Sequence, residues 1–267
     1  MTSDLIAGEV RVEGRRVAYR ANGDPAGRRG QRVLYVHGTG CSGVVWEGHL
    51  AAIADVHTAV AIDLPAHGRS EGPSFRGAAD HAHVVAELAS ALGWERFVVA
   101  GHSMGGAVAL SCALYHAERL DGLVLVDTGA RLRVHPDILR GAREAAAAGR
   151  RPATPREWAF ARATPQALVD AVAAMTADVD ARVTYADWIC DDSFDCLSRV
   201  GEIAHPTLAV CGEEDRLTPP AYHRFFQSRM PRCELAIVRG AGHWVFQEQP
   251  AAFTRVVRDF LDRLPAG

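Results

Sequence analysis

The stretch "FVVAGHSMGGAVALSCALYHA", residues 97–117, decides the fold. It begins as a valine-rich apolar run typical of a strand, passes a serine flanked by glycines, and continues as an alanine-rich run typical of a helix. Its turn, Gly101-His102-Ser103-Met104-Gly105, fits the pattern G-x-S-x-G. Small flanking residues permit a sharp, strained turn, which leaves the serine side chain exposed above a sheet. The stretch therefore predicts a strand, a sharp turn at Ser103 and a helix.

The same order of strand and helix recurs along the chain. Short apolar runs rich in Val, Ile and Leu, mostly without polar alternation, are typical of parallel strands buried on both faces. These runs are "RVLYVHG" (32–38), "TAVAIDLP" (58–65), "FVVAGHS" (97–103), "LDGLVLVDT" (120–128), "PTLAVCGEED" (206–215) and "CELAIVRGAGH" (233–243). Helix-like segments separate most of them. We therefore expect an α/β fold with a doubly wound, mostly parallel sheet of about eight strands.

Two segments depart from this alternation. The stretch "EVRVEGRRVAYRANG" alternates in polarity around Glu13 and Gly14, which predicts a hairpin at the edge of the sheet. Between residues 129 and 205 the chain is helical in pattern, rich in alanine and interrupted by prolines. An insertion between two strands is typical of a cap over a sheet. We predict a core domain of residues 1–128 and 206–267 and a helical cap of residues 129–205.

Composition excludes several classes of protein. Of the 267 residues, 48% are hydrophobic and 23% are charged, which are ordinary values for a globular chain. The net charge of −3 provides no basic surface for nucleic acid. No apolar run is long enough to cross a bilayer, and the first residues do not resemble a signal peptide. We expect a cytoplasmic protein that binds neither nucleic acid nor a membrane.

A serine hydroxyl needs a base within hydrogen-bond reach before it can attack a carbonyl group. His243 follows the last predicted strand in the glycine-rich loop "GAGHWVFQEQP", although a histidine on such a loop can also have no special role. For the acid that orients it, our first choice is Asp215, at the end of the preceding predicted strand. Asp127 ends another predicted strand and is the main alternative, with Glu213 and Glu214 as further candidates. The chain order serine, acid, histidine favours Asp215.

Attack on a carbonyl group also needs hydrogen-bond donors for the developing oxyanion. The glycine-rich turn "VHGTGCSG", residues 36–43, follows a predicted strand. We expect the backbone N–H groups of Thr39 and Met104 to form a two-donor oxyanion hole. No cluster of His, Cys or Asp suggests a metal site, and we expect His81 and His83 to lie along a solvent-facing helix. The predicted chemistry needs neither a cofactor nor a metal.

These motifs together resemble those of the α/β-hydrolase superfamily. They are "HGTG" (37–40), "DLPAHGRS" (63–70), "GHSMGG" (101–106), "GEEDRLTPP" (212–220) and "GAGHW" (240–244), in the order found in that family. Ala66 stands where many relatives have glycine. The resemblance covers nearly the whole chain and implies a catalytic triad of Ser103, Asp215 and His243.

Serine at position 103 excludes the haloalkane dehalogenases and epoxide hydrolases of this fold, which use aspartate there. We predict a serine hydrolase that cleaves a small or medium carboxylic ester, a lactone or a thioester. One alternative is a carbon–carbon hydrolase of ring-cleavage products, because such enzymes often share "GHW" at the histidine loop. They commonly carry asparagine where this chain has His102. A second alternative is a ligand receptor that retains the triad without turnover.

The expected partner is therefore a small-molecule ester. Aromatic residues near the motifs and in the predicted cap are candidates for binding it, although such residues lie more often in a core than in a pocket. The candidates are Trp46, Trp158, Trp188, Trp244 and Phe246.

Overall fold

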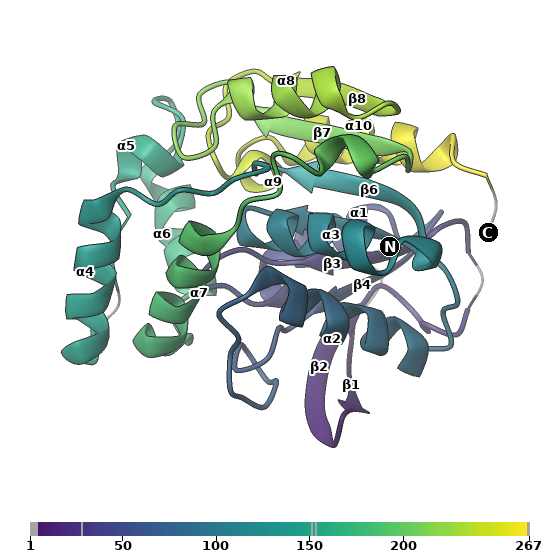
Figure 1. Ribbon diagram of the computed structural model, residues 1–267, viewed down its shortest axis with the longest axis horizontal. Coiled ribbons are helices and arrows are strands. Elements are labelled where there is room, and N and C mark those ends of the chain that lie inside the picture. Colours follow the sequence, from purple (N-terminus) through teal and green to yellow (C-terminus); the bar gives the residue numbers. More distant parts are fainter. Residues whose placement is uncertain (1–4, 28, 151, 153, 266–267) are drawn as a thin grey trace.

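One mixed β-sheet runs through the molecule and carries helices on both faces (Figure 1). The computed structural model describes residues 5–27, 29–150, 152 and 154–265. Its strands are β1 (Ile6–Val12), β2 (Arg15–Ala21), β3 (Arg32–Val36), β4 (Thr58–Ile62), β5 (Phe97–His102), β6 (Leu120–Val126), β7 (Thr207–Gly212) and β8 (Cys233–Val238). The sheet order is β1-β2-β4-β3-β5-β6-β7-β8. Within the described residues, β2 pairs antiparallel with both β1 and β4, and every other pair is parallel, so the predicted α/β class is confirmed.

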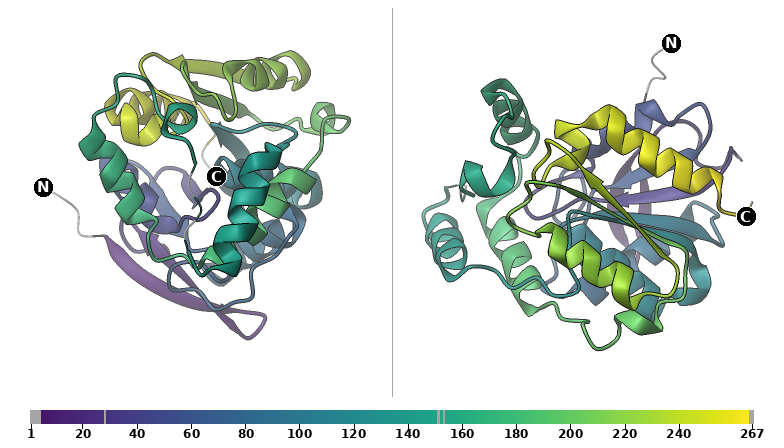
Figure 2. Two further views of the ribbon diagram at one scale, coloured as in Figure 1. Left: turned by 90° about the vertical axis from the view of Figure 1, so that its left-hand side faces the viewer. Right: turned by 90° about the horizontal axis from the view of Figure 1, so that it is seen from above.

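Helices connect these strands and cover the sheet. Around the sheet they are η1 (Gly43–Trp46), α1 (Glu47–Ala52), α2 (Ala78–Ala91), α3 (Met104–Tyr115), η2 (Ala117–Arg119), α8 (Pro220–Arg229), α9 (Val245–Glu248) and α10 (Pro250–Asp262). Helices α2, α3 and α8 contribute to the buried cluster on one face, and α1 and α10 contribute to the cluster on the other. Figure 2 shows α8 and α10 on opposite sides of β7 and β8.

The inner strands read as continuous apolar runs because both of their faces are covered. In β3, Leu34 and Val36 pack in the cluster with α2 and α3, whereas Val33 and Tyr35 pack in the cluster with α1 and α10. All four side chains are fully buried. Alternate residues of one strand thus stabilise two separate cores, as expected for a parallel sheet between two helical layers.

The hairpin turn at Glu13 and Gly14, and Ala66 in a later loop, both have left-handed backbone. Strands β1 and β2 form the predicted edge hairpin, with φ of 48° at Glu13 and 80° at Gly14. Two successive positive φ values match the right-handed twist of a hairpin. Ala66 has φ of 70°, a conformation that favours glycine. The departure from the family's glycine therefore places a methyl group on strained backbone.

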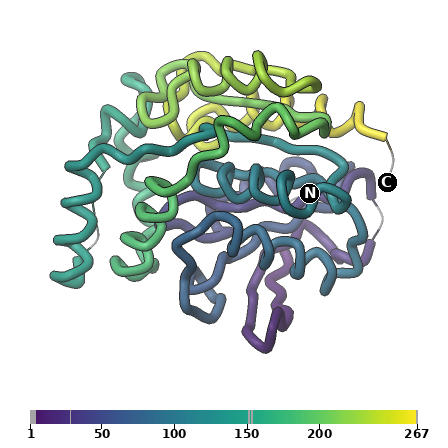
Figure 3. Tube along the Cα trace, in the orientation of Figure 1, coloured from purple at the N-terminus to yellow at the C-terminus, as the bar shows by residue number. Residues whose placement is uncertain are grey.

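Residues 129–205, which we call the insertion, connect β6 to β7. They form α4 (Pro136–Ala147), α5 (Arg156–Ala159), α6 (Gln166–Met175), α7 (Ala181–Ser193) and η3 (Val200–Glu202). Figure 3 shows the helices of the insertion beside the carboxyl ends of the parallel strands. Both ends of the insertion pack into the main core, through Leu132, Cys196 and Val200. The division into core and cap stays a prediction, and its outer limits, residues 1–4 and 266–267, lie outside the described residues.

One expectation about helix α2 is wrong. His81 does not face solvent: its side chain is buried, with its ring edge against Phe75 at 5.3 Å between centroids. His83, two residues along, is exposed and pairs with Glu13 at 3.2 Å. Two residues along a helix point to different sides, so the pair cannot share one environment. Among the described residues, no group of three or more His, Cys, Asp or Glu side chains is placed to hold a metal ion.

Within the same part of the chain, no helix is both long enough and apolar enough to traverse a bilayer. Five of the six cysteines are buried, and Cys233 is partly exposed. The buried ones are small core side chains.

Buried histidines predict a loss of stability in acid. Burial lowers the pKa of His49 and His102 to about 3, and that of His81 and His223 to about 4. In the unfolded chain these groups take up protons below about pH 6.5, whereas in the fold they stay neutral. The unfolded state therefore binds more protons, and the free energy of unfolding should fall from about pH 6.5 toward pH 4.

Each such histidine should lower that free energy by up to about 1.4 kcal/mol per pH unit. Urea unfolding at several pH values measures the slope. The variant His81→Leu should make the slope shallower by the share of one histidine, and an unchanged slope would contradict this assignment.

Candidate active site

Ser103 lies on the turn between β5 and α3, with φ of 53° and ψ of −117°. Such a backbone is strained for any residue other than glycine. The flanking glycines leave room for it. A Cβ atom added at Gly101 would lie 2.0 Å from the carbonyl oxygen of Gly105, and one added at Gly105 would lie 2.4 Å from that of Val36. Glycine is therefore required at both positions for the turn to close.

The loops after β7 and β8 bring Asp215 and His243 together. Their side chains are buried, and the ring Nδ1 of His243 lies 2.9 Å from Asp215 Oδ2. Oδ1 of Asp215 accepts the N–H groups of Leu217 at 2.8 Å and Thr218 at 3.0 Å. Burial opposes the charged form of Asp215, but His243 and these hydrogen bonds outweigh it and hold the pKa of Asp215 well below its usual range.

Asp127, the main alternative acid, has a different environment. Its Oδ1 accepts the N–H of Gly212 at 2.9 Å and its Oδ2 accepts the N–H of Val245 at 3.1 Å. Burial and the neighbouring Asp215 raise its pKa well above the usual range. Its carboxyl group thus joins the end of β7 to the start of α9 and has no hydrogen bond to His243. Glu213 and Glu214 are exposed.

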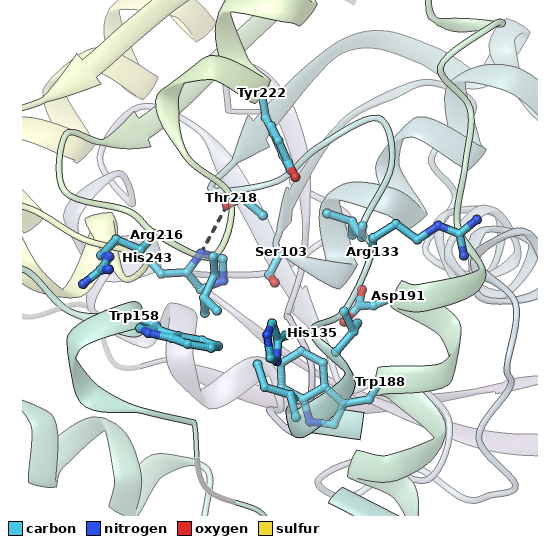
Figure 4. A pocket seen from close by; sticks show the side chains of 14 residues that line it. Ser103, Arg133, His135, Trp158, Trp188, Asp191, Arg216, Thr218, Tyr222 and His243 are labelled. Carbon is cyan, nitrogen blue, oxygen red and sulfur yellow. Dashed lines mark hydrogen bonds between the residues drawn. The ribbon is translucent and has the colours of Figure 1, made fainter. Parts of the chain in front are cut away.

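Ser103 and His243 border the same space. Figure 4 shows the Ser103 side chain beside the imidazole ring, with the dashed line marking the 3.2 Å contact between Thr218 Oγ1 and His243 Nδ1. No hydrogen bond joins the serine hydroxyl to the ring among the described residues. Catalytic hydrogen bonds of this kind are often loose without substrate and tighten in the complex.

Two backbone donors are available near the serine. Thr39 follows β3 in a turn closed by the N–H of Cys41 on the carbonyl of Gly38 at 3.2 Å, and Met104 begins α3. Within the described residues, neither the Thr39 N–H nor the Met104 N–H has an acceptor. Free N–H groups beside a helix N-terminus are suited to a developing negative charge.

Sequence reasoning missed the groups that hold the histidine loop. His102 Nε2 donates to the carbonyl of His243 at 2.8 Å. Oε1 of Glu248 accepts the N–H groups of Gly242 at 2.8 Å and Trp244 at 3.2 Å, and its Oε2 accepts the N–H of Ala161 at 2.8 Å. Glu248 therefore joins the histidine loop to the insertion. Its place at the end of α9, five residues after the histidine, is a signal that could have indicated this role.

Helix α7 of the insertion holds the turn that carries Thr39. The Thr39 hydroxyl donates to Asp191 Oδ2 at 2.6 Å, and the N–H of Gly40 donates to Asp187 Oδ2 at 2.8 Å. The ring Nε2 of His67 donates to the same Asp187 oxygen at 2.8 Å. Burial opposes a charge on His67, but Asp187 outweighs it and raises the pKa of His67. No local sequence pattern indicates these contacts, because the contacts to Thr39 and Gly40 join residues 152 and 147 positions apart.

Two cavities meet at Ser103. Both are bordered by Ser103, Trp188, Leu217 and His243. Cavity A, about 350 Å³, is also lined by Leu132, Arg133, Val134, His135, Ile138, Trp158, Asp191, Arg216, Thr218 and Tyr222. Cavity B, about 440 Å³, is also lined by Thr39, Gly40, Cys41, His102, Pro152, Thr154, Arg156, Ala159, Phe160, Val169, Val172, Ala173, Thr176, Thr184 and Trp244. Volumes of this size suit small ligands.

The aromatic candidates divide into two groups. Trp158 and Trp188 border cavity A, and Trp188 and Trp244 border cavity B. Trp46 and Phe246, expected to bind substrate, line neither cavity. They are buried in the core cluster with α10, where their rings stack at 4.2 Å between centroids. This packing removes their large apolar surfaces from water, so the two side chains stabilise the core.

Comparison with known proteins identifies the family. A model described as "Alpha/beta hydrolase family" matches residues 33–256, so the chain belongs to that family. A solved structure of a thermophilic esterase is 33% identical, with a TM-score of 0.84, 99% of this chain covered and 100% of that chain covered.

Two curated relatives match at lower identity. The pimeloyl-(acyl-carrier protein) methyl ester esterase of Aeromonas hydrophila subsp. hydrophila is 25% identical, over 87% of this chain and 96% of its own length. The 2-hydroxy-6-oxo-6-(2'-aminophenyl)hexa-2,4-dienoic acid hydrolase of Metapseudomonas resinovorans is 24% identical, over 88% of this chain and 85% of its own.

The two buried aspartates predict different effects of the same substitution. Asp215→Asn should favour the wrong tautomer of His243 and lower kcat by orders of magnitude, about 10⁴ in a serine protease triad, with the melting temperature little changed. Asp127→Asn places an amide NH₂ against a backbone N–H, so it should lower stability and leave most of the kcat of the folded protein. Ester turnover and thermal unfolding of both variants measure this. A larger loss of kcat in Asp127→Asn would move the acid to β6.

Proposed function

We propose that this α/β hydrolase cleaves a small or medium carboxylic ester, a lactone or a thioester through an acyl-enzyme on Ser103. One observation carries the proposal: His243, which is hydrogen-bonded to Asp215, borders the same cavities as a serine on a strained turn. The two N–H groups without acceptors, at Thr39 and Met104, support it further. The likeness to a thermophilic esterase at 33% identity favours ester chemistry.

In the first half of the reaction, His243 Nε2 takes the proton of the Ser103 hydroxyl as its oxygen bonds to the carbonyl carbon. The carbonyl π electrons move to the oxygen, and the N–H groups of Thr39 and Met104 stabilise the resulting oxyanion. The intermediate then collapses, the bond to the leaving group breaks, and His243 gives its proton to that group. The acyl group remains on Ser103.

In the second half, water repeats the sequence. His243 removes a proton from water, the hydroxide oxygen bonds to the acyl carbon, and the proton returns to the Ser103 oxygen as the acid is released. Asp215 holds Nδ1 of His243 protonated throughout, so that Nε2 is the nitrogen that exchanges protons. It also stabilises the imidazolium form.

The two cavities give separate places for the two parts of an ester. Cavity B is walled by apolar side chains of the insertion, among them Val169 and Val172 of α6. Cavity A is lined in part by polar side chains, among them Asp191 and Tyr222. We propose that the insertion acts as a cap that selects the substrate, because α5, α6 and α7 provide walls to these cavities while the reacting groups stand at strand ends.

A carbon–carbon hydrolase is the second candidate. The relative from Metapseudomonas resinovorans is named for such a substrate, and Trp244, next to the candidate base, borders cavity B. This chain departs from the pattern of those enzymes at His102, where they commonly carry asparagine. The ring of His102 donates a hydrogen bond to the carbonyl of His243. Turnover of a vinylogous diketone more efficiently than of any alkyl ester would favour this candidate.

A serine-directed reagent tests the nucleophile. A fluorophosphonate should label Ser103 alone in the wild type, because the turn exposes one activated hydroxyl. Ser103→Ala should remain unlabelled and lose ester turnover by at least about 10³-fold. Intact mass and peptide mapping locate the label, and thermal unfolding shows that the variant is folded. Folded wild type that takes up no label and hydrolyses no ester would favour a receptor role.

Substitution of the cavity tryptophans tests the cap. Trp158→Ala and Trp188→Ala enlarge the space next to Ser103 and should shift the preferred acyl or alkoxy chain length, with turnover of the smallest esters retained. Steady-state kinetics on esters of graded length measure kcat/KM for each. Tyr115→Ala is the matched control, because this exposed tyrosine lines neither cavity. A uniform loss on every ester would contradict a selective role for the insertion.

A further inference from the structure

The candidate base is held through its backbone as well as through its ring. The N–H of His243 donates to the carbonyl oxygen of Ala159 at 2.9 Å, and the carbonyl of His243 accepts from the ring of His102 at 2.8 Å. Its ring Nδ1 is paired with Asp215. These contacts leave Nε2 for the hydroxyl of Ser103, which lies beside the ring (Figure 4). The reach of Nε2 to that hydroxyl therefore depends on how the loop around His243 is held.

Glu248 holds this loop on both sides of the histidine. Its Oε1 accepts the N–H of Gly242 at 2.8 Å and the N–H of Trp244 at 3.2 Å. These two residues directly precede and follow His243, so one oxygen atom fixes the chain at both neighbours of the candidate base. Glu248 itself lines neither cavity, and so it is not placed to contact a substrate.

The second oxygen of Glu248 binds the insertion. Its Oε2 accepts the N–H of Ala161 at 2.8 Å and the hydroxyl of Thr164. A Cβ atom added at Gly242 would lie 2.7 Å from the backbone nitrogen of Ala161, so the histidine loop and the insertion are in direct backbone contact here. One carboxylate thus fixes two segments of the chain to each other beside the candidate base.

Neither ion pairing nor helix formation explains an acid at this position. All four groups that donate to Glu248 are neutral. Glu248 is also the last residue of α9, and the C-terminal end of a helix disfavours a negative charge. A carboxylate does provide acceptor sites on both of its oxygens, whereas a glutamine amide provides them on one side only. The pattern of donors, two in the histidine loop and two in the insertion, therefore requires an acid.

We propose that Glu248 is a positioning residue for the candidate base. It holds the loop around His243 so that Nε2 reaches the hydroxyl of Ser103, and it makes this placement depend on the contact with residues 159–164 of the insertion. Glu248 acts through His243 and touches neither the substrate nor the reacting atoms. This inference rests on the proposed function, and it adds a second role for the insertion besides providing walls to the cavities.

Glu248→Ala tests the proposal by removing all four contacts. In the folded variant, kcat/KM should fall about 100-fold, the cost of displacing a reacting group by about 1 Å. The loss should be similar for short and long esters, because Glu248 lines neither cavity. The rate at which a fluorophosphonate labels Ser103 should fall by a similar factor, since that reaction uses the same base. Steady-state kinetics and time-resolved intact mass measure the two rates.

Two further variants divide these contacts. Glu248→Gln can keep its carbonyl oxygen on the histidine loop and direct its NH₂ to the hydroxyl of Thr164, so that the N–H of Ala161 loses its acceptor. Its kcat/KM should fall about tenfold, because one donor is left unpaired. Thr164→Val removes one donor on the insertion side and keeps the other three, so kcat/KM should stay within about threefold of the wild type.

Glu202→Ala is the matched control. This exposed glutamate ends η3, pairs with Arg199 at 3.0 Å and lines neither cavity. Its replacement removes a carboxylate from the end of a helical turn away from the histidine loop, so activity should be unchanged. Thermal unfolding of each variant sets a temperature at which all are folded, and every rate is compared at that temperature.

A proton resonance separates positioning from general stability. The proton that Asp215 holds on Nδ1 of His243 should resonate downfield of the backbone amides in the wild type, and Asp215→Ala, which removes the acceptor, should abolish that signal. Glu248→Ala should shift it or broaden it beyond detection, because the ring moves relative to Asp215, whereas Thr164→Val and Glu202→Ala should keep it. A contact that served only stability would leave the resonance in place in the folded variant.

A folded Glu248→Ala that keeps both rates within about threefold of the wild type would overturn the proposal. A changed chain-length preference with an unchanged labelling rate would also overturn it, because Glu248 would then only shape the insertion. If Glu248→Ala does not fold, Glu248→Gln decides, and a loss no greater than that of Thr164→Val overturns the proposal. Absence of ester turnover and of labelling in the wild type contradicts the proposed function instead. The resonance still tests the placement of His243 in that case, so the two failures are distinguishable.

Discussion

The left-handed backbone at Ser103 is the constraint on which the rest of the site depends. It can persist only where the surroundings over-determine it, and here two glycines, a parallel strand and the start of a helix do so. The strained turn has two consequences for the site. The same turn that places Ser103 at the two cavities also leaves the first N–H of α3 without an acceptor among the described residues.

The carboxyl edge of the sheet then separates two aspartates by environment. Asp215 meets an imidazole and several donors, which favour its charged form, whereas Asp127 is enclosed between two backbone N–H groups close to Asp215. Two like residues on neighbouring strands thus take different tasks, one orienting His243 and one joining β7 to α9. Environment rather than residue type assigns the roles.

The sequence predicts the positions of those site residues that depend on the order of the strands. Parallel strands end at one edge, so Ser103, Asp215 and His243 could be placed together from their positions after apolar runs. It predicts burial and side-chain neighbours poorly where these depend on packing between segments far apart in the chain. His81 is buried, and Trp46 and Phe246 lie in the core. Helix α7 directs two acids toward the turn that carries Thr39 and Gly40, although nothing in the local patterns indicates these neighbours. These placements depend on contacts between segments that lie far apart in the chain.

The contacts of α7 also limit how freely this part of the chain can be exchanged. Asp187 and Asp191, four residues apart on one face of the helix, hold Gly40 and Thr39, which belong to the sheet side of the molecule. A chimera that takes its helices from a relative would need acids at the same helical spacing to keep that turn in place. Under the proposed function, an exchange of the insertion that altered the substrate range would therefore also disturb the turn that carries Thr39.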